Sequence, residues 1–554
     1  MIRLLALVCA AMALLAPTAR AAEAGFVMLG GTIYTAARER PVEALVVRDG
    51  KIVYAGLAVA ARRISVGLKE IDLKGAVAFP GFVDSHVHLT GVGLREMTLN
   101  LDQAASLAEL VAAVKAWDAA HPGAEPLTGR GWIETHWPEK RFPTRADLDT
   151  VSTTRPIVLE RADGHAVVLN SAALRLAGIT AATTDPAGGR IERDAAGEAT
   201  GMLIDGAMVL IEPKLPPLSY ERRKEALARG TALYAARGWT RAVNMSTSAE
   251  DVKALVALAA EGRLPIRVDI FMTPEDSAEV LTRGPYADPT GLVRVRGVKL
   301  YMDGALGSRG AALLKPYSDR PDTSGLLIAD HDATVAILKR ALASKAQVAL
   351  HAIGDRGNRL AIDWMYEVLL ADPPSAAQVT WRIEHAQVID PIDIPRLAKL
   401  GVVASMQPSH AIGDLYFAPA RLGPDRLAGA YAWKSLLEAG VPVVFGTDAP
   451  VEVGDPRIEF YAAVARKDLK GRSDPDWNPG EALSRTDALA ALSTSGAAVV
   501  ADPGPPTGHG PGPADITVFS ADILTLPEAD ILTVKPLLTI VGGNIVHDGR
   551  QTRN

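Results

Sequence analysis

The chain has 554 residues, 48% of them hydrophobic, and a formal net charge of -6. Because a single core rarely grows past roughly 250–300 residues, we expect one large domain with a smaller one beside it. Lysine and arginine are scattered rather than clustered, which leaves no basic stripe for nucleic acid. The sequence has one cysteine, Cys9, so a metal site elsewhere must use histidine, carboxylate or modified lysine.

The first 21 residues have the three parts of a secretory signal peptide. Arg3 precedes the apolar run Leu4–Ala16, and Ala19 and Ala21 form a small-x-small cleavage site. The apolar run is shorter than the roughly 20 residues that cross a bilayer, which argues against a membrane anchor. We expect cleavage near Ala21, export to the periplasm or the medium, and a mature protein without membrane attachment.

Short strands are predicted at both ends of the mature chain. Near the start, Gly31–Thr35 precedes a hairpin over Ala44–Gly56 that turns at Asp49 and Gly50. Near the end, Ala514–Phe519 and Leu538–Gly549 follow a linker rich in proline and glycine, Pro503–Pro513. Neither set can bury a core alone, so we predict one small β-sandwich domain from residues 22–78 and 505–554.

Residues 79–504 alternate short apolar segments with helical stretches, the rhythm of a parallel sheet. The eight predicted strands are Phe82–His88, Thr240–Met245, Ile266–Phe271, Val295–Leu300, Val348–His351, Thr380–His385, Val402–Gln407 and Val443–Asp448. Eight strands are what a closed barrel needs, so the expected fold is α/β, a (β/α)8 TIM barrel. The stretch of about 90–237 is too long for one connection and is predicted to form an inserted subdomain over the barrel mouth. Pro156–Arg161 is a ninth strand candidate that the sequence does not exclude from the barrel.

Two histidines, His86 and His88, end the first of these strands. The period-two geometry of a strand points both side chains to the same face, although a His-x-His motif alone fits a structural role equally well. His351, His385 and Asp448 end three other predicted strands, and the carboxyl ends of barrel strands form the rim where active sites are built. Five potential ligands on four strands favour a metal site over ordinary rim polar groups.

Lys299 lies near the end of the predicted strand Val295–Leu300. A buried, unpaired ammonium group is costly and does not bind metal. Carbamylated by carbon dioxide, however, this lysine becomes a carboxylate on a long stem that can bridge two cations. The alternative is a rim lysine whose ammonium group reaches solvent, and the five other ligand candidates favour the first reading.

Several segments together resemble the amidohydrolase superfamily and, within it, amidohydrolase family 3. They are His86–His88, Gly297–Arg309, His351–Arg356, Arg382–Gln387 and Gly446–Pro450. The likeness covers nearly the whole mature chain, including Arg161–Ala166 and Asn170–Leu174. It is specific for the superfamily and much less so for the substrate.

The resemblance implies a pair of divalent metal ions. It assigns His86, His88 and Asp448 to the more buried ion, His351 and His385 to the more exposed one, and carbamylated Lys299 to a bridge between them. Such families also contain members with one metal, so the count stays open. Zinc is the default for histidine and carboxylate ligands, although ligand type does not exclude manganese, iron or cobalt.

The function implied is hydrolysis by metal-activated hydroxide. Two cations about 3.5–4 Å apart lower the pKa of a bridging water, and Asp448, which resembles the family's catalytic aspartate, would pass the water's proton to the leaving group. We predict an enzyme, similar to N-substituted formamide deformylases, that cleaves a non-peptide carbon–nitrogen bond of a small molecule. The alternatives are an esterase or lactonase using the same site, and a catalytically silent binding or regulatory protein. Whether the chain forms homo-oligomers stays open.

Candidate substrate contacts are less sharply defined. Ser308 and Arg309 could clamp a substrate carbonyl or carboxylate, although a loop arginine is more often part of a surface ion pair. Trp132 and His165, in the insertion, are candidates for a lid over the metals, with a packed tryptophan and a hydrogen-bonded loop histidine as the alternatives. His410 is predicted to face the substrate without binding metal. The segment Gly131–His136 departs from the acidic-glutamine sequence expected after the tryptophan, which leaves the substrate most open.

Overall fold

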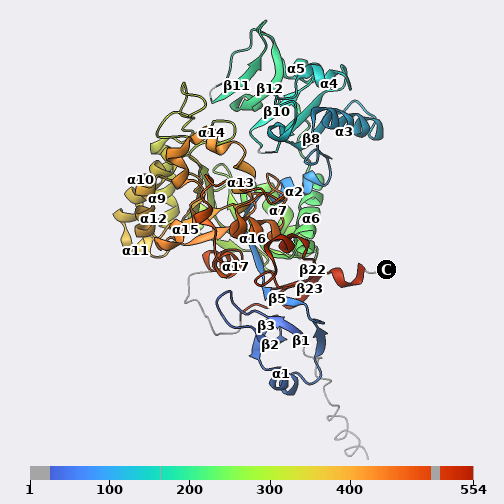
Figure 1. The fold of residues 1–554 in the computed structure, drawn as a ribbon, viewed down its shortest axis with the longest axis vertical. Helices are drawn as coiled ribbons and strands as arrows, with labels where there is room; N and C mark the ends of the chain where they lie inside the picture. Colours follow the sequence, from blue (N-terminus) through green and yellow to red (C-terminus); the bar gives the residue numbers. More distant parts are fainter. Residues whose placement is uncertain (1–24, 163, 187, 501–511, 553–554) are drawn as a thin grey trace, which may run out of the picture.

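The computed structural model describes residues 25–552 except 163, 187 and 501–511. The predicted signal peptide and most of the linker Pro503–Pro513 therefore lie outside the described residues. In the part that is described, no helix combines the length and apolar character that crossing a membrane requires. The chain forms three sheets, and Figure 1 shows the barrel between an inserted sheet at one end and a sheet built from both chain ends at the other.

The central sheet is the predicted barrel of eight parallel strands, and all eight predicted segments contribute a strand. In barrel order these are β6 (Phe82–Val87), β13 (Trp239–Thr247), β14 (Arg267–Met272), β16 (Val293–Tyr301), β17 (Gln347–Ala352), β18 (Arg382–His385), β19 (Val403–Met406) and β20 (Val443–Phe445). A two-residue strand, β15 (Tyr286–Ala287), pairs with β16 outside this path. β20 ends three residues before the predicted strand does, because residues 446–448 leave the ladder to form part of the rim.

Helices follow most barrel strands and cover the outside of the barrel (Figure 1). The main ones are α6 (Tyr220–Arg237), α7 (Ala249–Ala260), α8 (Val280–Arg283), α9 (His331–Ser344), α10 (Asp355–Ala371), α12 (Ile394–Leu400), α15 (Trp433–Glu438), α16 (Pro456–Ala465), α17 (Arg485–Ala491) and α18 (Thr494–Val499). Their inward faces and the barrel strands share one extensive apolar core. Two short helices, α13 (Pro408–Asp414) and α14 (Ala418–Leu422), lie between β19 and α15.

The barrel is closed between its first and last strands by the residues that follow β6 and β20. The N–H of Asp448 donates to the carbonyl of His86 at 2.7 Å, and the N–H of His88 donates to the carbonyl of Ala449 at 2.8 Å. Gly446 is required at this seam, since a Cβ there would lie 2.3 Å from the backbone nitrogen of His86. The closure therefore places two predicted ligand segments side by side.

Asp84 reinforces this seam and also contacts helix α6 through Tyr234. Its carboxylate accepts hydrogen bonds from the backbone N–H of His86 (3.1 Å) and of Thr447 (2.9 Å), and from the hydroxyls of Thr447 (2.6 Å) and Tyr234 (2.9 Å). Burial outweighs these hydrogen bonds and raises the pKa of Asp84 to about 6. A fully buried carboxylate thus fixes the two ends of the sheet to each other.

The insertion after β6 forms a six-stranded sheet of its own. Its order is β11 (Gly189–Arg193), β12 (Ala199–Asp205), β10 (Ala166–Leu169), β9 (Ile157–Arg161), β8 (Leu127–Trp132) and β7 (Leu99–Asn100). The helices α3 (Leu107–Ala120), α4 (Arg145–Asp149) and α5 (Ser171–Ala177) belong to the same segment. The ninth strand candidate is thereby placed: β9 pairs with β8 and β10, outside the barrel. Two further helices, α2 (Leu89–Arg95) and α6, connect the insertion to the barrel.

Both ends of the described chain meet in one mixed sheet, where the sequence predicted a small β-sandwich built from both termini. Its strands are β1 (Gly25–Ile33), β2 (Val42–Arg48), β3 (Lys51–Gly56), β4 (Lys69–Asp72), β5 (Val77–Pro80), β21 (Ile516–Phe519), β22 (Pro536–Val541) and β23 (Asn544–Asp548), with α1 (Ala58–Ile64) alongside. The predicted turn at Asp49 and Gly50 joins β2 to β3 with φ values of 49° and 74°, the left-handed pair that a tight hairpin needs. Arg267 of the barrel pairs with Asp515 at 2.8 Å and connects this sheet to the barrel.

Candidate metal centre

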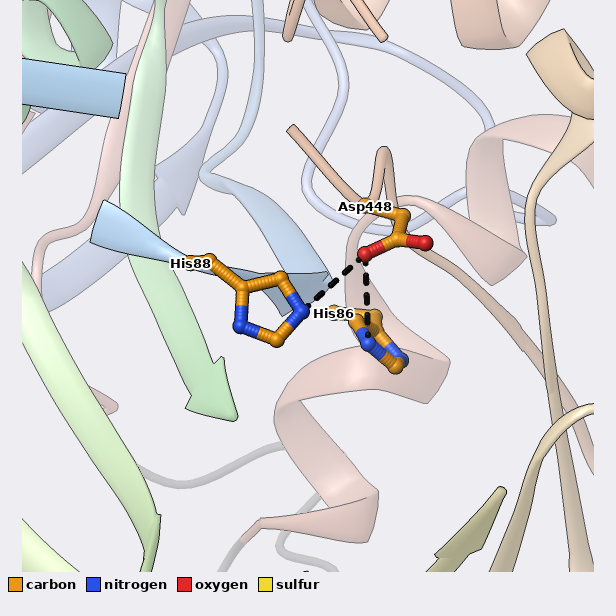
Figure 2. A group of neighbouring side chains, drawn as sticks. All are labelled: His86, His88 and Asp448. Carbon is orange, nitrogen blue, oxygen red and sulfur yellow. Dashed lines mark ion pairs between the residues drawn. The ribbon is translucent and has the colours of Figure 1, made fainter. Parts of the chain in front are cut away.

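Three of the predicted ligands, His86, His88 and Asp448, meet at the mouth of the barrel. The Nε2 atoms of His86 and His88 lie 3.4 Å and 3.2 Å from Oδ1 of Asp448. Figure 2 shows both imidazole rings directed at this one carboxylate. The potential ligand atoms of the three residues all lie within 4.8 Å of one another, so the group could hold one metal ion.

The local backbone explains why these side chains converge. His86 lies in β6, and His88 is the residue just before α2. Asp448 has φ 56° and His385 has φ 70°, in the left-handed region that costs a non-glycine residue about 1–3 kcal/mol and that occurs most often at functional sites. The strain redirects two chain segments so that their side chains reach the barrel mouth.

Lys299 lies next to this group, inside the barrel. Lys299 is 1% exposed, so its ammonium group does not extend into solvent. Its Nζ is 3.5 Å from Nε2 of His86. Burial lowers the pKa of Lys299 to about 8, although the charges of Glu384 and Asp448 act in the opposite direction. A neutral amine, the form that reacts with carbon dioxide, is therefore accessible near neutral pH.

A second group with ligand chemistry shares Asp448. His385, His410 and Asp448 have potential ligand atoms within 4.8 Å of one another, and the His410 Nε2 is 3.8 Å from Asp448 Oδ2. The sequence predicted His410 as a residue facing the substrate only, whereas its position also fits a ligand. His351, the predicted partner of His385, has its ring centroid 4.5 Å from that of His385.

Two of the inner histidines, His86 and His385, have a hydrogen-bonded partner on one ring nitrogen, whereas His351 faces a carboxylate without a hydrogen bond. The Nδ1 of His86 is 2.6 Å from Glu384, the Nδ1 of His385 is 2.8 Å from the side-chain oxygen of Gln407, and the Nε2 of His351 is 3.6 Å from Asp303. Such outer partners orient a metal-binding imidazole and set which nitrogen carries its proton. The arrangement leaves Nε2 of His86 and His385 and Nδ1 of His351 for a cation.

The charge states of these groups suit metal binding. Burial, with the nearby charge of Lys299, lowers the pKa of His86 to about 4. Burial and the neighbouring histidines hold the pKa of His351 and of His385 well below the usual range. Burial alone would raise the pKa of Asp448, but His86, His88 and His385 outweigh it and hold the pKa far below the usual value. Neutral imidazoles and an ionised carboxylate are the forms that coordinate cations.

The sequence reasoning missed the outer partners Glu384, Asp303 and Gln407. Glu384 is fully buried between Arg382 and His86, and Asp303 accepts backbone hydrogen bonds from Ala312, Ile353 and Gly354 at 2.8–2.9 Å. A usable signal for Glu384 was its position two residues after Arg382, which puts both on one face of β18. No comparable pattern marks Asp303, because its partners come from two separate loops.

The ligand groups open into a cavity of about 760 Å³ between the barrel mouth and the inserted sheet. The barrel contributes the predicted ligands, Tyr301 and Glu452, and the insertion contributes Arg130 and His165. His165 lines this cavity, and its Nδ1 is 2.8 Å from Asp205. A volume of this size admits a small molecule.

Three of the predicted substrate contacts need correction. Trp132 is fully buried in the core of the insertion, and its indole N–H donates to the carbonyl of Leu159 at 3.0 Å. Arg309 pairs with Asp319 at 2.8 Å, and the Ser308 hydroxyl donates to the carbonyl of Ala305. None of the three is among the residues that line the cavity. Their polar groups are already satisfied within the protein, which is the alternative that the sequence left open.

The donor set fits divalent cations. Imidazole nitrogens and carboxylate oxygens are the ligands of zinc and of related first-row metals, and two such groups lie side by side with Asp448 in common. A barrel whose strand ends carry these ligands around one cavity defines the class of metal-dependent hydrolases.

Comparison with known proteins gives the family. The profile of the amidohydrolase family, Amidohydro_3, matches residues 69–547, and the chain belongs to this family. YtcJ of Bacillus subtilis is 34% identical over 532 residues, which cover 94% of this chain and 98% of YtcJ. The crystal structure of an uncharacterized metal-dependent hydrolase from Pyrococcus horikoshii is similar with a TM-score of 0.74 and 29% identity, over 91% of this chain and 99% of that one.

A further relative has a named reaction. The N-substituted formamide deformylase of Arthrobacter pascens is 27% identical over 468 residues, which cover 82% of this chain and 85% of the deformylase. The chain is therefore an amidohydrolase-family metal-dependent hydrolase by fold and family.

Proposed function

We propose that this protein hydrolyses an amide-type carbon–nitrogen bond, other than a peptide bond, in a small molecule, with two divalent metal ions at the barrel mouth. One observation carries the proposal: His86, His88 and Asp448 converge within 4.8 Å beside a second group that shares Asp448. Both groups face the same cavity of about 760 Å³. Six side chains from five separate segments of the chain line this one cavity, an arrangement that unrelated polar residues would not be expected to form.

Bound cations would supply an activated water molecule and polarise the carbonyl group of the substrate. Zinc suits this donor set of imidazole and carboxylate. The residues that would hold the ions are His86, His88, Lys299, His351, His385 and Asp448, with His410 as a further candidate.

Asp448 is the group best placed to move a proton. Its Oδ1 faces His86 and His88, and its Oδ2 faces His410 and the cavity. Asp448 accepts a proton from the attacking water at a carboxylate oxygen and donates it to the nitrogen that leaves, so that the carboxylate is regenerated. General acid–base transfer of this kind contributes about 10²–10⁴-fold to a rate.

Lys299 acts as a carbamate in this proposal. Its neutral amine attacks carbon dioxide, a nitrogen–carbon bond forms, and the displaced proton passes to solvent, which leaves a carboxylate. Two facts support the step: the ammonium group is buried without a hydrogen-bonded carboxylate among the described residues, and the pKa of Lys299 is lowered to about 8. The carbamate would lie beside His86 and within reach of both ligand groups.

An amide is favoured over an ester because a relative with a named substrate acts on an N-substituted formamide. The same site could attack the carbonyl of an ester or lactone, so a panel of substrates must decide. The panel pairs each N-formyl and N-acetyl aniline with the phenyl ester of the same acid. We expect metal-dependent hydrolysis of at least one anilide. If the protein hydrolyses the esters and none of the anilides, it is an esterase and not an amidase.

Metal analysis of the purified protein provides the second part of the test. We expect two divalent ions per chain by elemental mass spectrometry, and the mass of one added carbon dioxide per chain in native mass spectra of the folded protein at neutral pH, absent in Lys299→Ala. The variant His86→Ala should lose metal, whereas His331→Ala, at an exposed histidine in α9, should keep it. A chain that binds no metal, or that binds metal but hydrolyses no member of the panel, would support a silent binding protein instead.

A further inference from the structure

Arg130 brings a positive charge from the inserted sheet into the catalytic cavity. It lies in β8 (Leu127–Trp132) and lines the same cavity as the proposed metal ligands. Its side chain is 15% exposed. A guanidinium group that is mostly buried in a cavity wall either serves the fold or binds a ligand, and its contacts distinguish these roles.

The contacts of Arg130 leave part of its hydrogen-bonding capacity unused. Its Nη2 donates to the carbonyl of Ala162 at 3.0 Å. Its Nε is 3.4 Å from Oε1 of Glu160, but the geometry is not that of a hydrogen bond, and the buried Nε finds no acceptor in the described part of the chain. Buried polar groups in folded proteins are nearly always paired, so an unpaired donor in a cavity wall points to an acceptor on a ligand.

The other arginines of this wall are committed to the protein. Arg95 donates to the carbonyls of Glu452 and Val453 at 2.8–2.9 Å. Arg161 forms two hydrogen bonds with the carboxylate of Glu134, at 2.9 Å and 3.1 Å. Arg130 differs from both because, among the described residues, its side chain donates one hydrogen bond, to the carbonyl of Ala162.

Arg130 also lies close to the segments that carry the metal ligands. A Cβ placed on Gly91 would be 3.9 Å from Nη1 of Arg130 and 2.9 Å from the ring of Pro450. Gly91 follows His88 by three residues, and Pro450 follows Asp448 by two. The absence of a side chain at Gly91 keeps the space between the guanidinium group and the barrel rim open.

We propose that Arg130 binds a carboxylate on the substrate and so selects anionic amides for this site. The planar guanidinium fork matches a carboxylate with two parallel hydrogen bonds, which neither a lysine nor a neutral donor provides. Because the side chain of Arg130 is only 15% exposed, such a charged hydrogen bond would be stronger there than in open water. The proposal rests on the proposed amide hydrolysis and adds the class of substrate.

Glu160 is the one acidic residue in ion-pair distance of Arg130 among the described residues, and it does not block this role. Its side chain is 38% exposed, against 15% for Arg130, so it can turn towards water when a ligand carboxylate arrives. The 3.4 Å contact between Arg130 and Glu160, which is not a hydrogen bond, would then be replaced by hydrogen bonds between Arg130 and the substrate carboxylate.

The test compares two N-formyl anilines that differ only in charge, 4-formamidobenzoate and 4-formamidobenzamide. The metal-loaded wild type should show a kcat/KM about 10- to 100-fold higher for the carboxylate, the range that hydrogen bonds to charged groups support. Arg130→Gln should bring the ratio of the two close to one, mainly through KM of the carboxylate, and Arg130→Lys should keep part of the preference.

Arg155→Gln provides the matched control. Arg155 is in the same insertion and is 13% exposed. It pairs with Asp118 at a distance of 2.7 Å, and neither residue lines the cavity. This variant should destabilise the insertion but keep the wild-type substrate ratio. An unchanged ratio in Arg130→Gln, or an equal fall in Arg155→Gln, would overturn the role of Arg130.

A binding measurement separates this proposal from the hydrolysis that it rests on. If neither formanilide is cleaved, the proposed function fails for formamides, and calorimetric titration of the metal-loaded protein with 4-formamidobenzoate decides the role of Arg130. Tighter binding to the wild type than to Arg130→Gln supports the carboxylate site. Equal binding, or no binding to the wild type, rejects it.

Discussion

The barrel mouth and the inserted sheet face the same cavity but are built in different ways. At the mouth, the ligands lie at the ends of strands whose register is fixed by the hydrogen bonds of the barrel. One such backbone hydrogen bond runs from the N–H of Asp448 to the carbonyl of His86. The insertion has its own sheet and its own apolar core around Trp132 and Trp137. The comparison suggests that metal chemistry and substrate selection belong to two separately packed parts, so damage to one part should leave the other partly intact.

The largest effect is expected at the mouth itself, from Asp448→Asn. Loss of the proton-transferring carboxylate should lower kcat by about 10²–10⁴-fold, while most of the bound metal stays because the imidazole ligands are unchanged. Turnover of the best anilide and metal content by elemental mass spectrometry measure the two effects. Asp455→Asn, at the start of α16 and away from the cavity, is the control and should keep its turnover. Full activity in Asp448→Asn would remove this residue from the mechanism.

In the insertion, Trp132→Ala should open the sheet without emptying the metal site. Truncation of a buried tryptophan costs about 3–5 kcal/mol, and Trp132 is fully buried in the core of the insertion. Limited proteolysis should cut within residues 99–205 first, with metal content close to that of the wild type. Trp433→Ala, at a fully buried tryptophan of the barrel core, should produce the reverse pattern. Metal loss in Trp132→Ala would show that the two parts are coupled.

A smaller effect is expected from Asp303→Asn, which changes the orientation of a metal ligand, His351, and leaves the ligand itself in place. The Asp303 carboxylate faces His351 and accepts three backbone N–H groups. Loss of an outer partner typically lowers metal affinity by 10–100-fold, so competition with a chelator should remove one metal more easily. Asp319→Asn, whose carboxylate pairs with Arg309 outside the cavity, should leave affinity unchanged. If chelator curves for Asp303→Asn and the wild type coincide, the contact to His351 has no role in binding.

The smallest effect is a pH-dependent change in stability from Glu459→Gln. Glu459 is buried next to Ser409, and burial holds its pKa well above the ordinary value. The folded wild type therefore keeps a proton that the unfolded chain releases above about pH 4.5, and stability falls as pH rises above that value. Glutamine removes this fall, so the difference in melting temperature should widen from pH 5 to pH 8. Glu438→Gln, at an exposed position, should follow the wild type, and parallel curves for Glu459→Gln would contradict the assignment.

The barrel could be predicted from the sequence because its signals are local. Each strand is a short, mostly apolar run, and four of the predicted segments end in a histidine or an aspartate: His88, His351, His385 and Asp448. Strand ends were less predictable: the ladder stops at Phe445, although the predicted strand continues to Asp448. The position of Pro156–Arg161 could not be decided locally, because membership of a sheet depends on pairing with β8 and β10.

The site was predictable to the extent that its residues share strand ends. His86, His88, Lys299, His385 and Asp448 follow that rule, and the structure brings them together. Arg309 and Trp132 were chosen by residue type alone, and their partners, Asp319 and the carbonyl of Leu159, are contacts that no spacing reveals. The guanidinium group that does enter the cavity, that of Arg130, comes from a strand whose side-chain direction only the folded insertion fixes.

The start of β6 is hydrogen-bonded to β21, a segment that is synthesised much later. The N–H of Phe82, at the start of β6, donates to the Thr517 hydroxyl across a separation of 435 residues. All six predicted ligands are translated before β21, so a growing chain carries the complete set of donors while the neighbour of β5 is still missing. Since domains fold as units during synthesis, a cation captured early would meet an unfinished site. Metal loading is therefore expected to follow the pairing of β21, and truncation before Ile516 should lower metal uptake although it removes no ligand.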